Sequence, residues 1–316
     1  MLLYSLIDQG KSDLDFTQAT ARINLKVRRL FDREITLSLR TRGRYDQRAR
    51  AYNSQVERNA WENRIWEMSL TYDDPSSAVK LSAGRILPWR VAGAGYLDGL
   101  LIESRLNTRT HFGVFAGSRP HWAYDASAVD LQKAGGYFTF VAGKPDGVNL
   151  EQTVAGIGEY HNYNVSREHV SFQGRVGHAG NWGGYHTVEI DVNRSWRKEK
   201  AGEAFTLSSV YLGGWYRIIP KVRAGISYDN RVSYWSYDTR NTVDSLFDDL
   251  LRQGVRGQLD ITLPAHLQSS LSYGQRKRQG DIKPTASYSV SLLKSELWRK
   301  TARATVQYSG FNGPFE

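Results

Sequence analysis

The feature that most constrains this chain is an alternation of apolar and polar residues that recurs along almost its whole length. In residues 21–44, ARINLKVRRLFDREITLSLRTRGR, most apolar side chains hold every second position and the positions between them are polar and mostly cationic. Successive side chains of a β-strand point to opposite faces, so this period predicts a strand pair with one apolar and one cationic face. About sixteen such segments follow one another, and most span about 9 to 13 residues, longer than ordinary globular strands.

The connections between these segments are of two kinds. Tight turns are predicted at FDRE, DDPSS, NTRT, IPK and LPAH, and longer loops at 46–62, 87–98, 118–134 and 237–253. In the first half of the chain short and long connections alternate, which is typical of an up-and-down antiparallel barrel with turns at one end and loops at the other.

One segment departs from the period of two. Residues 242–253 place Val243, Leu246, Phe247 and Leu250 at helical spacing, with Asn241 as the N-cap and Gly254 as the stop. We expect a short helix inside a loop, which either packs on the rim of the sheet or obstructs a channel.

Two environments explain the alternation. In a soluble sandwich the apolar faces meet across a dry core, whereas in a membrane barrel they contact lipid and the polar face lines a wet lumen. The segment length matches the roughly 9 to 11 residues of a tilted membrane strand. Many Trp and Tyr residues fall near segment ends, as in interfacial girdles. The sequence therefore favours an all-β fold, a large antiparallel up-and-down transmembrane β-barrel of about 16 to 18 strands, in one domain over residues 1–316.

The long alternating hairpins, such as residues 21–44, resemble those of Gram-negative outer-membrane porin-like proteins. A pattern of alginate-export-type porins is a strand ending in Gly-Arg, then a loop, then an Asp-Gly that enters the next strand. The stretch VKLSAGRILPWRVAGAGYLDGLLIESRL resembles this pattern, with Gly84 and Arg85 before the loop and Asp98 and Gly99 after it. The resemblance implies a bacterial outer-membrane location. Such barrels usually begin with a leader and end on a terminal aromatic residue, so the missing leader and the ending FNGPFE suggest a fragment lacking terminal strands.

Cations dominate the predicted polar face. The chain carries 42 Lys and Arg against 32 Asp and Glu, a formal net charge of +10, which predicts attraction to anions. Strand parity assigns eleven cations to the lumen as pore-lining, anion-binding residues, and these are Arg22, Lys26, Arg28, Arg40, Arg42, Arg44, Arg105, Arg175, Arg223, Arg256 and Arg303. Arginine suits carboxylates and phosphates because its planar guanidinium donates two parallel hydrogen bonds. The alternative is that these cations form ion pairs with carboxylates and only stabilise the water-facing wall of the lumen. The candidate partners are Glu67, Glu103, Glu189, Asp191 and Asp260.

Motifs for chemistry are missing from the sequence. With no cysteine and no His-Glu-x-x-His pattern among seven histidines, no metal site is predicted. No Gly-x-Ser-x-Gly elbow occurs, and GAGYLDG lacks the spacing of a phosphate loop, so it is interpreted as a flexible loop. We therefore expect no enzyme activity and no cofactor.

The sequence thus predicts an outer-membrane pore or export channel with an arginine-rich lumen that favours anionic solutes or acidic polysaccharide. The expected partners are outer-membrane lipid and these solutes, and further a second copy of the chain or periplasmic export proteins. Two alternatives stay open: an outer-membrane barrel enzyme acting on lipid, and a soluble β-rich module that binds acidic glycans. A nucleic-acid binder is not favoured, because most strand aromatics fall on the apolar face or at strand ends rather than among the cations.

Overall fold

The computed structural model describes residues 2–6, 16–48, 59–121, 125–144, 146–242, 251–297 and 302–313. Nearly all of its regular structure is β-strand. The strands are β1 (Leu2–Leu6), β2 (Phe16–Val27), β3 (Ile35–Arg48), β4 (Asn59–Tyr72), β5 (Val79–Ile86), β6 (Leu97–Arg105), β7 (Thr110–Pro120), β8 (Ser127–Gly143), β9 (Val148–His161), β10 (Asn164–His178), β11 (Trp182–Val192), β12 (Phe205–Ile219), β13 (Val222–Arg231), β14 (Arg252–Leu263), β15 (Leu267–Arg278), β16 (Thr285–Leu297) and β17 (Ala302–Asn312).

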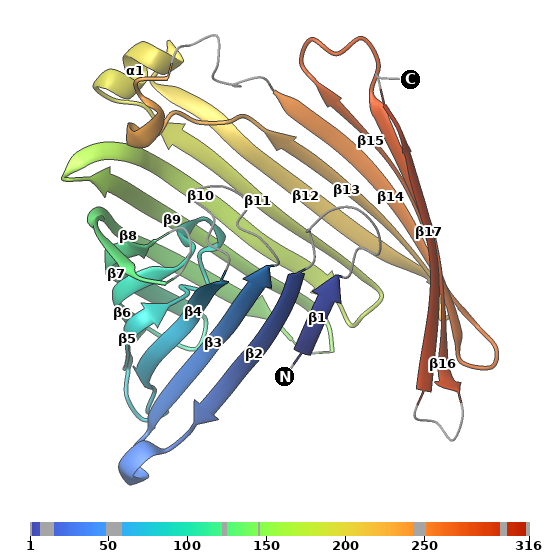
Figure 1. The fold of residues 1–316 in the computed structure, drawn as a ribbon, viewed down its shortest axis with the longest axis horizontal. Helices are drawn as coiled ribbons and strands as arrows, with labels where there is room; N and C mark the ends of the chain where they lie inside the picture. Colours follow the sequence, from blue (N-terminus) through green and yellow to red (C-terminus); the bar gives the residue numbers. More distant parts are fainter. Residues whose placement is uncertain are drawn as a thin grey trace.

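Each strand pairs antiparallel with the strand that precedes it and the strand that follows it in the chain, from β1 against β2 to β16 against β17. The result is one large sheet that curls around a central space (Figure 1). The predicted up-and-down architecture and strand number are confirmed, because long alternating segments joined by tight connections pair most readily with their sequence neighbours.

In the described part of the chain, helical structure is confined to the connections. It consists of three short 3-10 turns, η1 (Leu30–Asp32), η2 (Ala92–Ala94) and η3 (Tyr237–Thr239), and one short α-helix, α1 (Trp196–Ala201). The helix predicted over 242–253 falls mostly on residues 243–250, which lie outside the described residues, and Arg252 and Gln253 belong to β14. None of the described helices is long and apolar enough to span a membrane.

The two ends of the sheet differ in their connections. One end carries the tight turns after β2, β4, β6, β12 and β14, as predicted, and a further tight turn after β10. Asp74 shapes the turn between β4 and β5, and the hydrogen bonds it accepts from the hydroxyl and backbone N–H of Ser76 lower its pKa. The other end carries the longer segments 87–96, 193–204 and 232–242, whereas the predicted loop 118–134 is mostly strand. All the segments that fold back over the sheet in the described part of the chain therefore come from this second end.

The apolar side chains of the strands form the outer face of the sheet, and no second sheet covers it among the described residues. Ile23 is 53% exposed, Leu100 58% and Ile226 64%. A water-soluble protein rarely exposes such a continuous apolar surface, since its removal from water is what drives folding. This outer face is therefore the surface that contacts lipid, and the soluble sandwich alternative is wrong.

The aromatic residues do not form a simple girdle. Tyr72 ends β4 as predicted, but Trp66 lies within β4 and Trp89 and Trp196 lie in connections. Trp66 faces the inner side, where the guanidinium of Arg42 lies 5.5 Å from its ring centre. A bulge in the pairing of β3 with β4, between Arg40 and Thr41, shifts the parity that the sequence alone predicts for Trp66.

Candidate functional site

The inner face of the sheet carries the candidate site, and its most distinctive part is the connection between β5 and β6. Residues 87–96, here called the inward loop, fold over the inner face instead of projecting into solvent. Val91 and Ala94, with Leu97 just after the loop, are fully buried, and they pack with a small apolar cluster on the inner face of β6–β9: Leu101, Phe115, Tyr137, Ala155 and Ile157. The interpretation of GAGYLDG as a flexible loop is wrong, because this apolar patch on the otherwise polar wall holds it in place.

Polar contacts tie the inward loop to distant strands. The side chain of Gln173 on β10 donates to the carbonyl of Arg90 and accepts from the N–H of Ala92, at 2.5 and 2.6 Å. Lys133 on β8 donates to the carbonyl of Ala94, and Arg40 on β3 donates to the hydroxyl of Tyr96. The loop thus contacts strands from β3 to β10 and narrows the space that the sheet encloses.

Glycine allows the tip of the inward loop to approach the wall closely. A Cβ atom on Gly93 would lie 2.9 Å from Oε1 of Glu189 and 3.0 Å from Nε2 of His169. Both neighbours are buried or half-buried on β11 and β10, so a larger residue would lift the tip away from the wall.

An ion pair joins the two ends of the inward loop. Arg85, at the end of β5, donates two parallel hydrogen bonds to Asp98 at 2.6 and 2.7 Å, and it also donates to the carbonyls of Ile65 and Ala126. Gly84 and Gly99 stand opposite each other beside this pair. The dipeptides Gly84-Arg85 and Asp98-Gly99, noted in the sequence, therefore belong to one structural feature that joins the two ends of the inward loop.

A row of arginines crosses three strands on the facing part of the wall. In the register of the sheet Arg22 of β2 stands opposite Arg42 of β3, which stands opposite Arg64 of β4. We call these three residues the arginine row. Arg64 pairs with Glu62 at 2.7 Å, but Arg22 and Arg42 make no ion pair in the described part of the chain. Two guanidinium groups here consequently lack carboxylate partners.

The predicted cations divide into two groups by their partners. Arg44 pairs with Asp46 and Glu62, Arg175 with Glu151, and Arg105 with Asp73. Within the described residues the others form no ion pair, and these are Arg22, Lys26, Arg28, Arg40, Arg42, Arg223, Arg256 and Arg303. The first group has carboxylate partners, but these are not the five carboxylates that the alternative named. Of those five, Glu103, Glu189 and Asp191 pair with cations that the parity argument did not select, and Glu67 and Asp260 form no ion pair in the described part of the chain.

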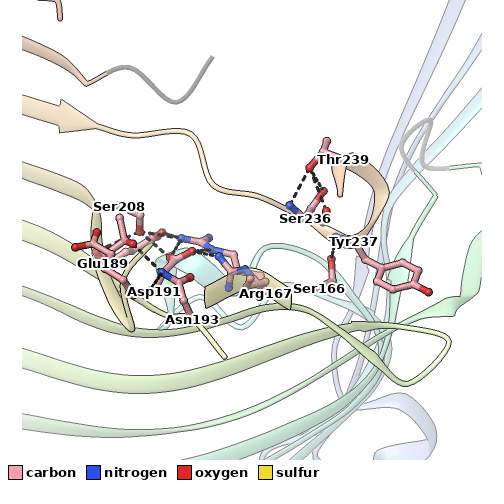
Figure 2. Close-up of polar contacts among 12 residues, drawn as sticks. Ser166, Arg167, Glu189, Asp191, Asn193, Ser208, Ser236, Tyr237 and Thr239 are labelled. Atoms are coloured by element: carbon pink, nitrogen blue, oxygen red, sulfur yellow. Dashed lines mark hydrogen bonds and ion pairs between the residues drawn. The ribbon is translucent and has the colours of Figure 1, made fainter. Parts of the chain in front are cut away.

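A buried polar cluster near the loop-bearing end is formed by Arg167, Glu189, Asp191, Arg197 and Ser208 (Figure 2). Asp191 is 1% exposed and accepts hydrogen bonds from both arginines at 2.7 Å and from Ser208 at 2.8 Å. Two cations face two carboxylates, so the cluster is balanced in charge and serves to hold strands and loops together.

This cluster joins the long connections to the wall. Arg197 belongs to α1, and the ring of Tyr234 lies 3.8 Å from the guanidinium of Arg167. Ser166 accepts a hydrogen bond from the N–H of Tyr237, at the start of η3 (Figure 2). Nearby in the 193–204 connection, Arg194 donates to Glu168, and these hydrogen bonds raise the pKa of Arg194. The 193–204 and 232–242 segments are therefore fixed against β10–β12.

Sequence reasoning missed the inward loop and the buried cluster for different reasons. A signal for the loop was present, since β6 reads Leu100, Leu101, Ile102 without alternation, which shows that both faces of this strand are covered or apolar. No sequence signal pairs Arg167 with Arg197 through Asp191. Among the histidines, His161 contacts Asp238 at 2.7 Å, and no metal-binding group of three His, Asp or Glu occurs in the part of the chain that the structure describes.

Comparison with known proteins rests on structure. No family model and no curated protein matches the chain. Among solved structures, Pseudomonas putida OprB, in its high pH structure, superposes with a TM-score of 0.55 at 9% identity, covering 98% of this chain and 92% of that one. Pseudomonas aeruginosa OccK5 gives 0.53 at 10% identity, covering 96% and 88%. Wzi of Escherichia coli, described as an outer-membrane protein involved in group 1 capsule assembly and a carbohydrate-binding β-barrel, gives 0.50 at 12%, covering 96% and 76%.

At these identities the likeness concerns the fold. It agrees with the exposed apolar outer face and the polar inner face, and both support the predicted location in the bacterial outer membrane. The chain has the fold of Gram-negative outer-membrane β-barrel porins.

Proposed function

We propose that the chain forms a channel of the bacterial outer membrane that favours anionic solutes or acidic polysaccharide. The observation that carries this proposal is the arginine row, where Arg22 and Arg42 face each other on the inner wall and have no carboxylate partner among the described residues. Uncompensated cations in a confined aqueous space lower the energy of an anion there and raise its local concentration.

The inward loop supplies the second element of the proposal. It narrows the lumen between the strands that it covers, β6–β9, and its Tyr96 hydroxyl contacts Arg40, two positions from Arg42 on β3. A solute that passes the loop therefore passes close to the arginine row. Solute moves by diffusion through water, and no bond has to be made or broken, so the channel needs neither a catalytic residue nor a cofactor.

Anion preference is tested by reversal-potential measurements in planar bilayers under a KCl gradient. We expect wild-type channels to prefer chloride over potassium, and the Arg22→Gln/Arg42→Gln variant to lose most of this preference. The matched control is Arg105→Gln/Arg175→Gln, which removes two cations that already pair with Asp73 and Glu151 and should retain more of the preference. A cation-preferring wild type, or a preference that survives in the first variant, would overturn the proposed selectivity.

A further inference from the structure

A groove lined by aromatic rings and arginines runs along the inner wall where β11–β14 lie side by side. It is lined by Tyr185, Tyr211, Trp215, Arg223 and Arg256, together with Gln258 and Asp260. The register places Tyr185 opposite Gly213, Trp215 opposite Gly225 and Arg256 opposite Ser227. In each of these three pairs a large side chain faces a small one, which leaves room above the wall.

Two of the rings lie flat against the wall because glycine occupies the neighbouring position. A Cβ atom on Gly213 would lie 2.3 Å from the ring of Tyr185, and one on Gly183 would lie 2.7 Å from the indole nitrogen of Trp215. Each ring therefore occupies the space over a bare backbone. Tyr185 turns its other face toward the lumen, whereas the guanidinium of Arg223 lies over the ring of Trp215. Tyr185 keeps 42% of its surface exposed in this position.

Hydrogen-bonding and charged groups border these rings. The Tyr185 and Tyr211 hydroxyls are 3.1 Å apart, and the guanidinium of Arg223 lies 4.0 Å from the ring centre of Trp215. Asp260 stands opposite Arg223 in the register, but it accepts hydrogen bonds from Gln258 at 2.9 Å and Ser270 at 2.7 Å instead. Arg223 and Arg256 therefore keep their guanidinium N–H groups free of carboxylates in the described residues.

We propose that this groove binds an acidic sugar, a pyranose ring that carries a carboxylate, as in the uronate units of an acidic polysaccharide. The proposal rests on the channel function above, because the ligand has to reach the inner wall. The C–H face of a pyranose is apolar and packs on an aromatic face, and its carboxylate matches the fork of an arginine. Gln258 and the tyrosine hydroxyls supply partners for the sugar hydroxyls.

Aromatic platforms are what distinguish this groove from the arginine row. A small inorganic anion gains from the cations alone and has no apolar face to place on the exposed ring of Tyr185. A neutral sugar would use the rings without Arg223 and Arg256. Only a ligand with both an apolar ring face and a negative charge uses the whole groove.

Isothermal titration calorimetry on the folded protein in detergent tests the proposal without requiring conduction. The probe is tetragalacturonate, and the comparison ligand is maltotetraose, a neutral tetrasaccharide. We expect tetragalacturonate to bind at least about tenfold more tightly than maltotetraose, and Trp215→Leu and Arg223→Gln each to weaken its binding by about tenfold. Trp215→Phe, which keeps a ring, should recover part of the loss.

Two matched controls separate the groove from general effects. Tyr216→Leu changes the next residue of β12, which lies on the outer face and is 59% exposed. Arg109→Gln removes an equal charge at an exposed position in the turn between β6 and β7, outside the groove. Both should bind tetragalacturonate like the wild type. Retained heat-modifiable migration on a denaturing gel shows that each variant is folded.

Four results would contradict the proposed sugar site. Two concern the wild type: equal affinity for both tetrasaccharides, or undetectable binding of tetragalacturonate. The third is a loss of affinity in the two control variants as large as in Trp215→Leu and Arg223→Gln, and the fourth is tighter binding of an oligodeoxynucleotide, which also offers rings and charge. Bilayer recordings on the same samples distinguish the two proposals. Binding without conduction would contradict the proposed channel function and support the sugar site in the groove. Anion-selective conduction without binding would contradict the sugar site and support the channel function.

Discussion

Arg22 of β2 lies directly opposite Arg42 of β3, on the face of the sheet that the inward loop also occupies. Like charges opposite each other on neighbouring strands destabilise the pairing by roughly 0.2–1 kcal/mol. Burial does not explain the arrangement, since Arg22 is exposed to solvent. The guanidinium of Arg42 lies over the ring of Trp66, but Arg22 makes no ion pair or hydrogen bond within the described residues that would offset this cost. Such an uncompensated cost is typical of residues that are retained for function.

The first prediction concerns this cost. Arg22→Gln removes the repulsion from Arg42 and none of the ion pairs of the described residues, so we expect the free energy of unfolding to stay equal or rise by up to about 1 kcal/mol. Arg44→Gln, on the next strand, removes pairs with Asp46 and Glu62 and should lower it. Urea unfolding of the folded barrels in detergent measures both. A loss of stability in Arg22→Gln as large as that in Arg44→Gln would show that Arg22 is structural.

The second prediction concerns the inward loop. Gln173→Ala removes the two hydrogen bonds that hold Arg90 and Ala92 against β10, so the loop should spend time away from the wall. Single-channel recording should then show a changed mean conductance and more current noise than the wild type. Gln268→Ala is the control, because Gln268 lies on the inner face of β15 and makes no hydrogen bond among the described residues. Identical traces for the two variants would mean that the loop does not border the ion path.

The third prediction concerns the buried cluster. Asp191→Asn removes the charge that both Arg167 and Arg197 contact, and it leaves buried cations poorly compensated. Breaking a buried pair in this way costs about 3–5 kcal/mol in other proteins. Asp260→Asn, on the same face, loses only hydrogen bonds from Gln258 and Ser270 and should cost clearly less. Thermal unfolding followed by circular dichroism compares the two, and equal losses would contradict the role assigned to the cluster.

The fourth prediction tests which face contacts lipid. Ile23→Arg places a charge on the outer face of β2, and at the bilayer midplane such a change costs about 2–4 kcal/mol. Asn24→Arg, one residue further along the same strand, places the same charge on the inner face and should cost little. Folding into lipid vesicles, followed by heat-modifiable migration, measures the difference. Equal folding yields for the two variants would remove the basis for the membrane interpretation.

The alternation in the sequence was sufficient to predict the strands, the approximate strand number and the two faces. Each of these properties is local, because a strand directs neighbouring side chains to opposite sides whatever it pairs with. Ile23 and Leu25 are exposed on one face and Arg22 lies on the other, as parity predicts. The tight turns were also readable, since Gly, Asp, Asn and Pro mark them locally.

The tertiary structure decided which cations are free and where the lumen narrows. Arg22 and Arg105 fit the same sequence pattern, but only the fold brings Asp73 to Arg105 and leaves Arg22 facing Arg42. The inward loop has no period of its own, and its position depends on an apolar patch assembled from four separate strands. A single sequence specifies the direction of each side chain along its strand, whereas ion pairs and loop contacts depend on which strands are neighbours and in what register.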